Sequence, residues 1–263
     1  MVKRIMEKFY VGLILLFLYA PIFVLIVLSF NQAKSRSKWG GFTLHWYREL
    51  FKNKYIMNAL YTTLIIALLS ALIATIIGTV AAIAISSMRK PPRTILIGIT
   101  NIPLLNADIV TGLSLMLLFV ALRFTLGFTS VLISHITFNI PYVILSVMPK
   151  IRQLSPNTYE AALDLGASPI YAFFKVILPD IFPGVLTGFF LAFTMSLDDF
   201  VITHFTKGPQ INTLSTKIYT EVRKGIKPEI YALSTLMFIA VLLLLVIINR
   251  RNADKKDTIK KFD

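Results

Sequence analysis

The chain has 263 residues, of which 56% are hydrophobic and 15% are charged, with a formal net charge of +14 and no cysteine. A soluble domain of this length does not need so large an apolar share, so a protein that folds within a membrane is indicated. Disulfides, thiolate nucleophiles and cysteine-bound metals are excluded. The basic residues flank apolar segments, which membrane topology and anionic lipid explain better than binding to nucleic acid.

Six long apolar segments predict six membrane-spanning helices, because about 20 apolar residues cross a bilayer. In chain order they cover residues 9–30, 58–87, 95–121, 129–148, 181–206 and 229–249. The first is too long for the apolar core of a signal peptide, so we expect an uncleaved helix. We expect one all-α transmembrane domain over residues 1–263, in which residues 250–263 form a lysine-rich, solvated tail.

Small residues recur at steps of three and four in two of these segments, which is typical of helices that pack closely in membranes. In the second segment they are Ala67, Ala71, Ala74, Gly78 and Ala82. In the fifth they are Gly184, Gly188, Ala192 and Ser196, and the same stripe continues through Asp199 and Thr203. Both segments are therefore predicted to approach a neighbouring helix closely.

Three carboxylates lie inside predicted spans, where a charge costs roughly 2.5–3.5 kcal/mol on insertion scales. They are Asp108 in the third segment and Asp198 and Asp199 in the fifth. At about 1.5 Å per residue all three fall in the outer half of the membrane, and Asp198 points about 100° away from Asp199. Such acids face a bundle interior or an aqueous path, so the three are candidate substrate-pathway residues. The alternative is that they pair with polar groups and hold the bundle together.

Residues 149–180 form the longest polar segment between two spans and predict two short helices. A hydroxyl followed by proline favours a helix start, and glycine favours a left-handed stop. The expected starts and stops are Ser155 with Pro156, Gly166, Ser168 with Pro169, and finally Pro179. By composition alone this is an ordinary amphipathic loop between spans.

The spacing within this loop resembles the EAA motif of permease subunits in ATP-driven (ABC) importers. That motif reads Glu-Ala-Ala, three residues, Gly, nine residues, Ile-x-Leu-Pro, and Val176 stands here in the Ile position. The matching residues are Glu160, Ala161, Ala162, Gly166, Leu178 and Pro179. In that family the loop is a coupling helix that docks on the cytoplasmic ATPase. The resemblance therefore implies that these residues contact an ATPase. It also implies a multi-pass protein of the bacterial inner (plasma) membrane, with both termini in the cytoplasm.

Other stretches are similar to the permeases of spermidine/putrescine importers, specifically the second of their two permease subunits. They are residues 31–50, 108–110, 134–143 and 196–201. The resemblance implies a type I ABC importer permease fold, a heterodimer with a sister permease, two ATPase subunits, an extracytoplasmic substrate-binding protein and surrounding lipid. In many relatives a proline precedes the acid at position 108, where this chain has Ala107. We therefore expect any break of the third helix to move to Pro103.

The same resemblance implies a transport component rather than an enzyme. The chain has no G-x-x-x-x-G-K-[ST] sequence, so ATP and Mg²⁺ are expected on the partner ATPase and no cofactor on this chain. One alternative keeps the importer and changes the cargo to an iron complex, thiamine or sulfate, although three intramembrane acids favour a cation. A secondary transporter would need inverted repeats, which the sequence lacks. A membrane enzyme is disfavoured because the three histidines are not at metal-binding spacing.

Overall fold

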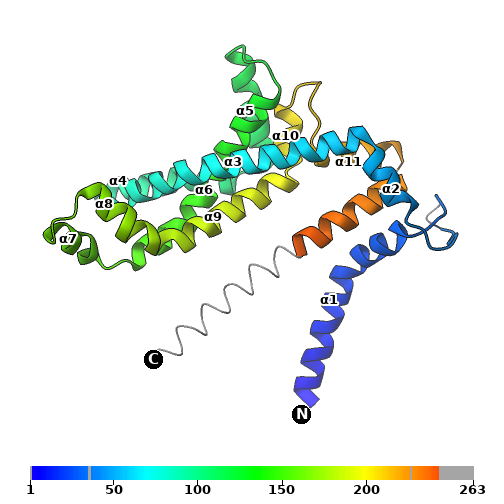
Figure 1. Ribbon diagram of the computed structural model, residues 1–263, viewed down its shortest axis with the longest axis horizontal. Coiled ribbons are helices and arrows are strands. Elements are labelled where there is room, and N and C mark those ends of the chain that lie inside the picture. Colours follow the sequence, from blue (N-terminus) through cyan, green and yellow to red (C-terminus); the bar gives the residue numbers. More distant parts are fainter. Residues whose placement is uncertain (1, 35–36, 226, 243–263) are drawn as a thin grey trace. The chain divides into compact units, whose positions relative to one another are not determined.

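The computed structural model describes residues 2–34, 37–225 and 227–242. Within these ranges every long element is a helix, and the one pairing of extended backbone is an antiparallel bridge between Asn31 and Phe42. The helices are α1 (Val2–Ser29), α2 (His45–Lys52), α3 (Lys54–Ser87), α4 (Lys90–Leu105), α5 (Asp108–Ala121), α6 (Phe128–Gln153), α7 (Pro156–Asp164), α8 (Pro169–Ala172), α9 (Leu178–Asp198), α10 (Val201–Thr206) and α11 (Leu214–Lys224) (Figure 1). A further helix covers Pro228–Leu242.

Four helical stretches of the described chain are long and apolar enough to cross a membrane. They are Lys8–Ser29, Lys54–Ser87, Phe128–Gln153 and Pro169–Asp198, and α4 with α5 makes a fifth if the bent pair counts as one span. The multi-span, all-helical fold predicted from the apolar segments is confirmed. Of the predicted sixth span, residues 229–242 are helical, whereas its last residues and the predicted tail fall in 243–263, outside the described residues.

The third span is broken, but not where the sequence indicated. α4 and α5 meet at an angle of 103° across Asn106 and Ala107, and Pro103 stays inside α4. Asn106 and Ala107 both have extended backbone, with ψ angles of 149° and 137°. The expectation that the break moves to Pro103 is therefore wrong. Two extended residues suffice to turn the chain without proline, and Pro103 removes only one hydrogen bond near the end of its helix.

The fifth span also differs from its prediction at both ends. Pro179 was expected to stop a helix, yet helix continues from Pro169 to Asp198. A π-helical turn at Phe173–Ile177 precedes the proline, and the N–H of Leu178 donates to the carbonyl of Phe173. This wider turn accommodates Pro179 in the first turn of α9, where its missing N–H costs little. At the other end the span breaks at Asp199 and Phe200 before α10 begins.

The chain divides into two compact units. The central unit is Asn58–Lys217, and the terminal unit combines Met1–Met57 with Ile218–Asp263. The interpretation of residues 1–263 as a single domain stays a prediction.

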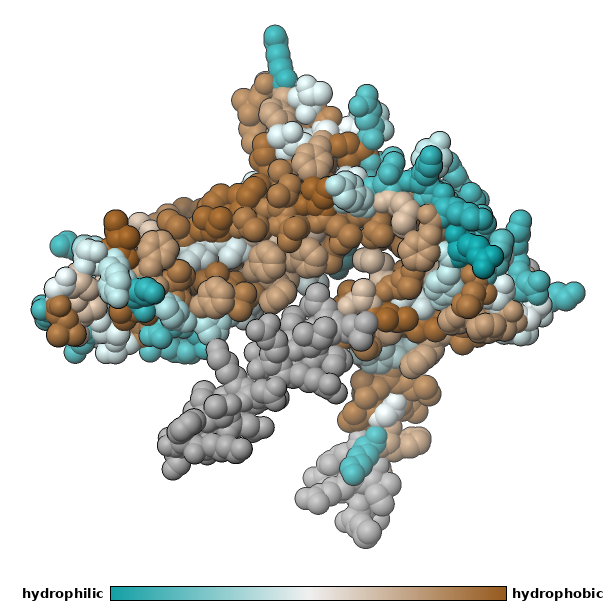
Figure 2. All heavy atoms as spheres, viewed as in Figure 1, coloured by the Kyte–Doolittle hydropathy of each residue, from teal (hydrophilic) through white to brown (hydrophobic). Residues whose placement is uncertain are grey.

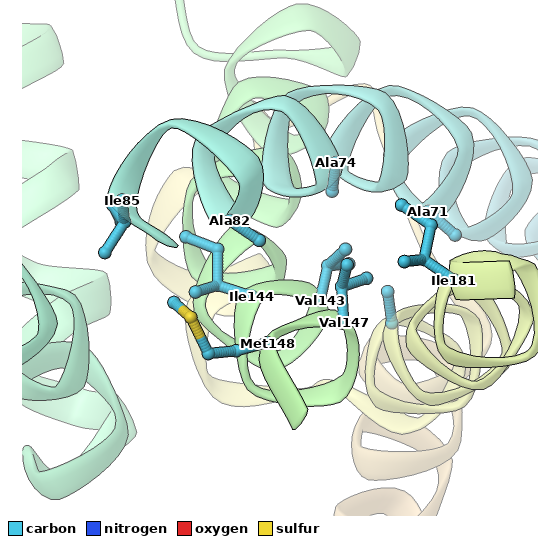
Figure 3. Close-up of a cluster of buried hydrophobic side chains, with 10 residues drawn as sticks. Ala71, Ala74, Ala82, Ile85, Val143, Ile144, Val147, Met148 and Ile181 are labelled. Atoms are coloured by element: carbon cyan, nitrogen blue, oxygen red, sulfur yellow. The ribbon is translucent and has the colours of Figure 1, made fainter. Parts of the chain in front are cut away.

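The core of the central unit lies where α3, α6 and α9 pack together (Figure 3). Its buried residues are Ala71, Ala74, Ala82 and Ile85 from α3, Val143, Ile144, Val147 and Met148 from α6, and Ile181 and Ala192 from α9. A Cβ atom on Gly78 would lie 2.7 Å from Cβ of Val143, and one on Gly188 would lie 3.2 Å from the Val143 Cα. The two predicted small-residue faces are thus confirmed, since both let a helix approach α6 closely.

Large apolar side chains cover the opposite side of α3. Leu68, Leu72, Ile76 and Val80 recur at four-residue steps and are exposed, while the alanines between them are buried. Figure 2 shows this hydrophobic surface along the long helices, with hydrophilic residues gathered at their ends and loops. A helix that buries small residues and exposes large apolar ones fits a lipid environment, because lipid replaces water as the outer solvent.

Within the terminal unit, Asn31 organises the loop that joins α1 to α2. Its side chain accepts the N–H groups of Ala33 (3.1 Å) and Gly40 (2.8 Å) and donates to the carbonyl of Lys38 (2.9 Å). The indole of buried Trp46 donates to the Asn31 carbonyl at 2.7 Å. These bonds hold the loop against the start of α2.

Candidate functional site

The EAA-like loop, residues 149–180, folds as a helix, a tight turn and a second helix. Gly166 adopts a φ of +86° directly after α7, and the N–H of Ala167 donates to the carbonyl of Ala162 at 3.1 Å. This bond is the signature of a left-handed helix stop that favours glycine. The hydroxyl of Ser168 then accepts the N–H of Tyr171 at 3.3 Å and caps α8. The predicted stop at Gly166 and the predicted second start at Ser168 are confirmed.

Apolar side chains project outward from this loop. Leu165 is 89% exposed and Ile170 is 73% exposed, and Tyr171 and Phe174 are exposed as well. Glu160 and Ala161 of the motif also lie on the surface, whereas Ala162 and Leu178 are half-buried. Exposed apolar groups beside a carboxylate mark a surface suited to a protein partner. The loop lies at one end of α6 and α9, away from the helix breaks (Figure 1).

A second candidate site lies at the two helix breaks of the central unit. Asp108 is the first residue of α5 and Asp198 is the last of α9, and both are exposed. The two carboxylates are close enough for their charges to interact, and Asp108 also interacts with Tyr142 of α6. Within the described residues neither acid is ion-paired to a basic side chain. Two such acids within electrostatic range of each other can attract a cation with more than one positive centre.

Asp199, the third predicted acid, lies in a different environment, with a side chain only 8% exposed. Its Oδ2 accepts the N–H (2.8 Å) and the hydroxyl (2.7 Å) of Thr203, and its Oδ1 accepts the N–H of Ile202 (3.2 Å). The carboxylate therefore satisfies the free N–H groups of the first turn of α10. Asp198 is exposed whereas the side chain of Asp199 is buried, so the two neighbouring acids lie in different environments, and the charge of Asp198 interacts with those of both Asp199 and Asp108.

A chain of hydrogen bonds leads from Asp199 into the bundle, and its direction follows from the carboxylate, which only accepts. The Thr203 hydroxyl donates to Asp199, so it receives a hydrogen bond from Nε2 of His135 at 2.9 Å. The other ring nitrogen of His135, Nδ1, lies 2.5 Å from the Ser196 hydroxyl and hydrogen-bonds to it. Ser196 lies 3.1 Å from the hydroxyl of Ser70. The network thus joins α3, α6, α9 and α10 through buried side chains.

The sequence alone did not identify this network. His135 and Asn139 are polar residues four apart on one face of an apolar segment, which marks a polar helix face but not its partners. Both are fully buried, and the amide of Asn139 extends the chain weakly to Ser70 at 3.5 Å. Within the described residues no group of three or more His, Asp or Glu is placed to hold a metal ion.

Comparison with protein families and curated proteins gives consistent matches. Residues 74–256 match the family described as the binding-protein-dependent transport system inner membrane component. The chain is 37% identical over 246 residues to the Escherichia coli K12 spermidine/putrescine transport system permease protein PotC, covering 94% of this chain and 93% of that protein. It is 40% identical over 232 residues to the putrescine transport system permease protein PotI of the same strain, covering 86% and 83%.

Solved structures show the same fold at low sequence identity. The chain resembles a bacterial ABC transporter involved in the import of the acidic polysaccharide alginate, with a TM-score of 0.73, 18% identity and coverage of 95% of this chain and 94% of that chain. A bacterial alginate ABC transporter in complex with its alginate-bound periplasmic protein matches with a TM-score of 0.71, 17% identity and coverage of 94% and 92%. At this identity the likeness concerns the fold alone.

Proposed function

Because the chain belongs to the family of binding-protein-dependent transport system inner membrane components, we propose that it forms one half of the translocation pathway of a bacterial ATP-driven importer. A sister permease forms the other half, so that the pathway is a heterodimer within the lipid bilayer. An extracytoplasmic binding protein delivers the cargo to the outer face. The observation that carries this proposal is the EAA-like loop, which presents Glu160 and exposed apolar side chains at one end of the bundle.

Each permease contacts one of two ATPase subunits through this loop. Glu160, Ala161, Ala162, Gly166, Leu178 and Pro179 are the proposed ATPase-coupling residues. The small alanines allow a close approach, Gly166 makes the turn that no other residue makes without strain, and Glu160 offers a charged hydrogen bond. ATP and Mg²⁺ bind on the ATPases, and this chain binds no cofactor. Closure of the ATPase pair draws the two loops together and opens the permease outward, and hydrolysis resets it inward.

The loop also determines the proposed topology. An ATPase that uses cellular ATP is cytoplasmic, so the surface around Gly166 faces the cytoplasm. The helix breaks that carry Asp108 and Asp198 then lie toward the outer side of the inner membrane. With six spans, both chain termini are cytoplasmic.

The proposed cargo is a polyamine such as spermidine or putrescine. The names of the two curated relatives support this cargo, and the surface chemistry is consistent with it. A polyamine carries several ammonium groups on a flexible chain, and Asp108 and Asp198 place two carboxylates within electrostatic reach of each other. We assign these two acids to contact with the cation. Asp199 belongs to the pathway region but lies behind its surface.

Uptake of radiolabelled spermidine and putrescine into cells that lack the gene, with and without its return, tests the proposal. Asp108→Asn and Asp198→Asn keep the size of each side chain and remove its charge. Since a hydrogen bond to a charged group contributes about 1.5–3 kcal/mol, each variant should raise the KM for uptake about tenfold or more. Membrane abundance of each variant is the control for folding.

Two results would count against the assignment. If loss of the gene leaves polyamine uptake unchanged, the cargo is another small solute, although the importer assignment stands. If uptake is restored and both variants keep the parental KM, the polyamine cargo stands and the two acids are not contact residues.

A further inference from the structure

We infer that Asp199, Thr203 and His135 are positioning residues, which hold the break between α9 and α10 and thereby set the spacing of the Asp108 and Asp198 carboxylates. The inference rests on the proposed function, in which those two acids contact the cation. It gives the two adjacent acids of the fifth span separate roles, whereas the sequence made both of them candidate pathway residues. Its basis is the hydrogen-bond geometry at the break.

The break requires side-chain support because it interrupts a helix in the apolar part of the protein. Asp199 has extended backbone, with φ −58° and ψ 123°, so the first N–H groups of α10 have no carbonyl partner in the preceding turn. Unpaired backbone groups in an apolar environment are strongly unfavourable. The Asp199 carboxylate accepts the N–H groups of Ile202 and Thr203 and so makes the break possible.

α6 holds α10 at both ends. At the first turn, His135 donates to the Thr203 hydroxyl, which in turn donates to Asp199. At the last turn, the Ser130 hydroxyl donates to the carbonyl of Thr206 at 2.7 Å. The serine and the histidine are both buried, so water does not compete for these bonds. The short helix α10 therefore has a defined position on α6.

α10 in turn determines where the two exposed acids stand. α5 packs closely on α10, since a Cβ atom on Gly112 would lie 3.2 Å from Cα of Ile202 and 3.2 Å from the ring of Phe205. α5 begins at Asp108, and α9 ends at Asp198, directly before the break. A shift of α10 would thus move one carboxylate relative to the other. The hydroxyl of Ser215 adds a further link, because it donates to the Asp199 carbonyl at 2.8 Å.

Burial and hydrogen bonding give Asp199 a different role from that of exposed Asp198. Both of its oxygens accept hydrogen bonds from α10, and Nε2 of His135 lies 3.4 Å from Oδ2. Its side chain is also only 8% exposed, so little of the carboxylate is open to a cation. Asp198 has no such role in capping α10 and is exposed.

The first test compares Thr203→Val with Thr203→Ser in polyamine uptake by the complete transporter. Valine has the shape of threonine but lacks the hydroxyl that joins His135 to Asp199, whereas serine keeps it. We expect Thr203→Val to raise the KM for spermidine about threefold to tenfold, because this is the usual net contribution of one or two hydrogen bonds. The ratio of the spermidine KM to the putrescine KM should change as well. Thr203→Ser should restore both. A purely structural defect lowers the amount of folded protein and hence Vmax, and leaves the KM ratio unchanged.

The second test uses the two adjacent acids and does not depend on the folding of Thr203→Val. Asparagine keeps one acceptor oxygen and so retains part of the cap, but it carries no charge. Asp199→Asn should therefore raise the KM clearly less than Asp198→Asn does, whereas Asp199→Leu, which cannot cap, should raise it more than Asp199→Asn. An equal rise in KM for Asp199→Asn and Asp198→Asn would overturn the inference, because it would mean that Asp199 acts through its charge.

The results separate this inference from the proposed function. If Asp108→Asn and Asp198→Asn raise the KM while Thr203→Val lowers Vmax alone, the contact role of the two acids stands and the positioning role is refuted. If neither Asp108→Asn nor Asp198→Asn changes the KM, the contact role fails and the positioning inference fails with it.

Discussion

Replacement of Gly78 by alanine tests the packing of the central unit most directly. Gly78 lies on the buried face of α3, and a Cβ atom added there would lie 2.7 Å from Cβ and 2.8 Å from Cγ1 of Val143. Val143 is fully buried on α6, and its Cβ is attached directly to the helix backbone. A rotamer change cannot relieve the contact with that Cβ, so the two helices must move apart.

The expected cost follows from two opposing terms. Overpacking a well-packed core destabilises a protein by about 1–3 kcal/mol. In a helix, replacing glycine by alanine stabilises the folded protein by up to about 1 kcal/mol, because alanine has the higher helix propensity. Because contacts of 2.7 and 2.8 Å place the overpacking in the upper half of that range, the net destabilisation is about 1–2 kcal/mol, and each kcal/mol lowers the Tm of a domain of this size by about 2–4 °C.

Gly98→Ala is the matched control, because Gly98 is also in a membrane helix and a Cβ atom there would meet nothing within 4 Å. The difference in stability is measured by thermal unfolding of the two variants in detergent. Unfolding is monitored as the loss of the monodisperse peak in size-exclusion chromatography. Gly78→Ala should melt several degrees below the parent protein, and Gly98→Ala at or above it. A Gly78→Ala variant as stable as Gly98→Ala would refute the close approach of α3 and α6.

Three further predictions concern the loops. Gly166→Val forces a branched side chain into a φ of +86°, so transport per ATP hydrolysed should fall, and normal coupling would argue against the loop assignment. Deleting Lys175 should close the π-helical turn into a regular α-helical one, which removes the wider turn that accommodates Pro179, and should lower uptake at normal membrane abundance; retained uptake would show that this turn is not critical. Asn31→Ala removes the hydrogen bonds to Ala33, Lys38 and Gly40 and should speed proteolysis of the loop between α1 and α2. Asn31→Asp keeps the oxygen that accepts the N–H groups of Ala33 and Gly40, so this variant should be cut at an intermediate rate. Equal rates would contradict the role of Asn31.

The features that sequence reasoning predicted depend on local chemistry or on long patterns. Long apolar segments predict spans because the bilayer demands a minimum length, whatever the neighbours are. Gly166 predicts a left-handed stop because the steric rule is local to one residue. The alanines of α3 predict a packed face because their spacing follows the helical period. None of these inferences needs knowledge of a tertiary partner.

The helix breaks were predicted poorly because they depend on what a segment packs against. Pro103 and Pro179 are the strongest local signals for a break, and both lie within continuous helix. Near the end of α4, and in the first turn of α9 after a π-helical turn, the missing N–H of proline costs little. The actual breaks at Ala107 and Asp199 lack proline. The second is capped locally by Asp199, but it is also held by His135 and Ser215 from other segments, and no rule of local propensity includes those contacts.

The same reasoning explains why Asp199 could not be assigned from the sequence. An acid inside an apolar segment indicates function because a buried charge is costly, and that argument applies equally to Asp198 and Asp199. What separates them is the helix break, since Asp199 becomes a cap only once Ile202 and Thr203 present free N–H groups. The polar stripe through Ser196 and Asp199 already pointed inward, toward His135. The helical period therefore indicated the direction of the side chain correctly, while its role depended on the one feature of the backbone that the sequence did not reveal.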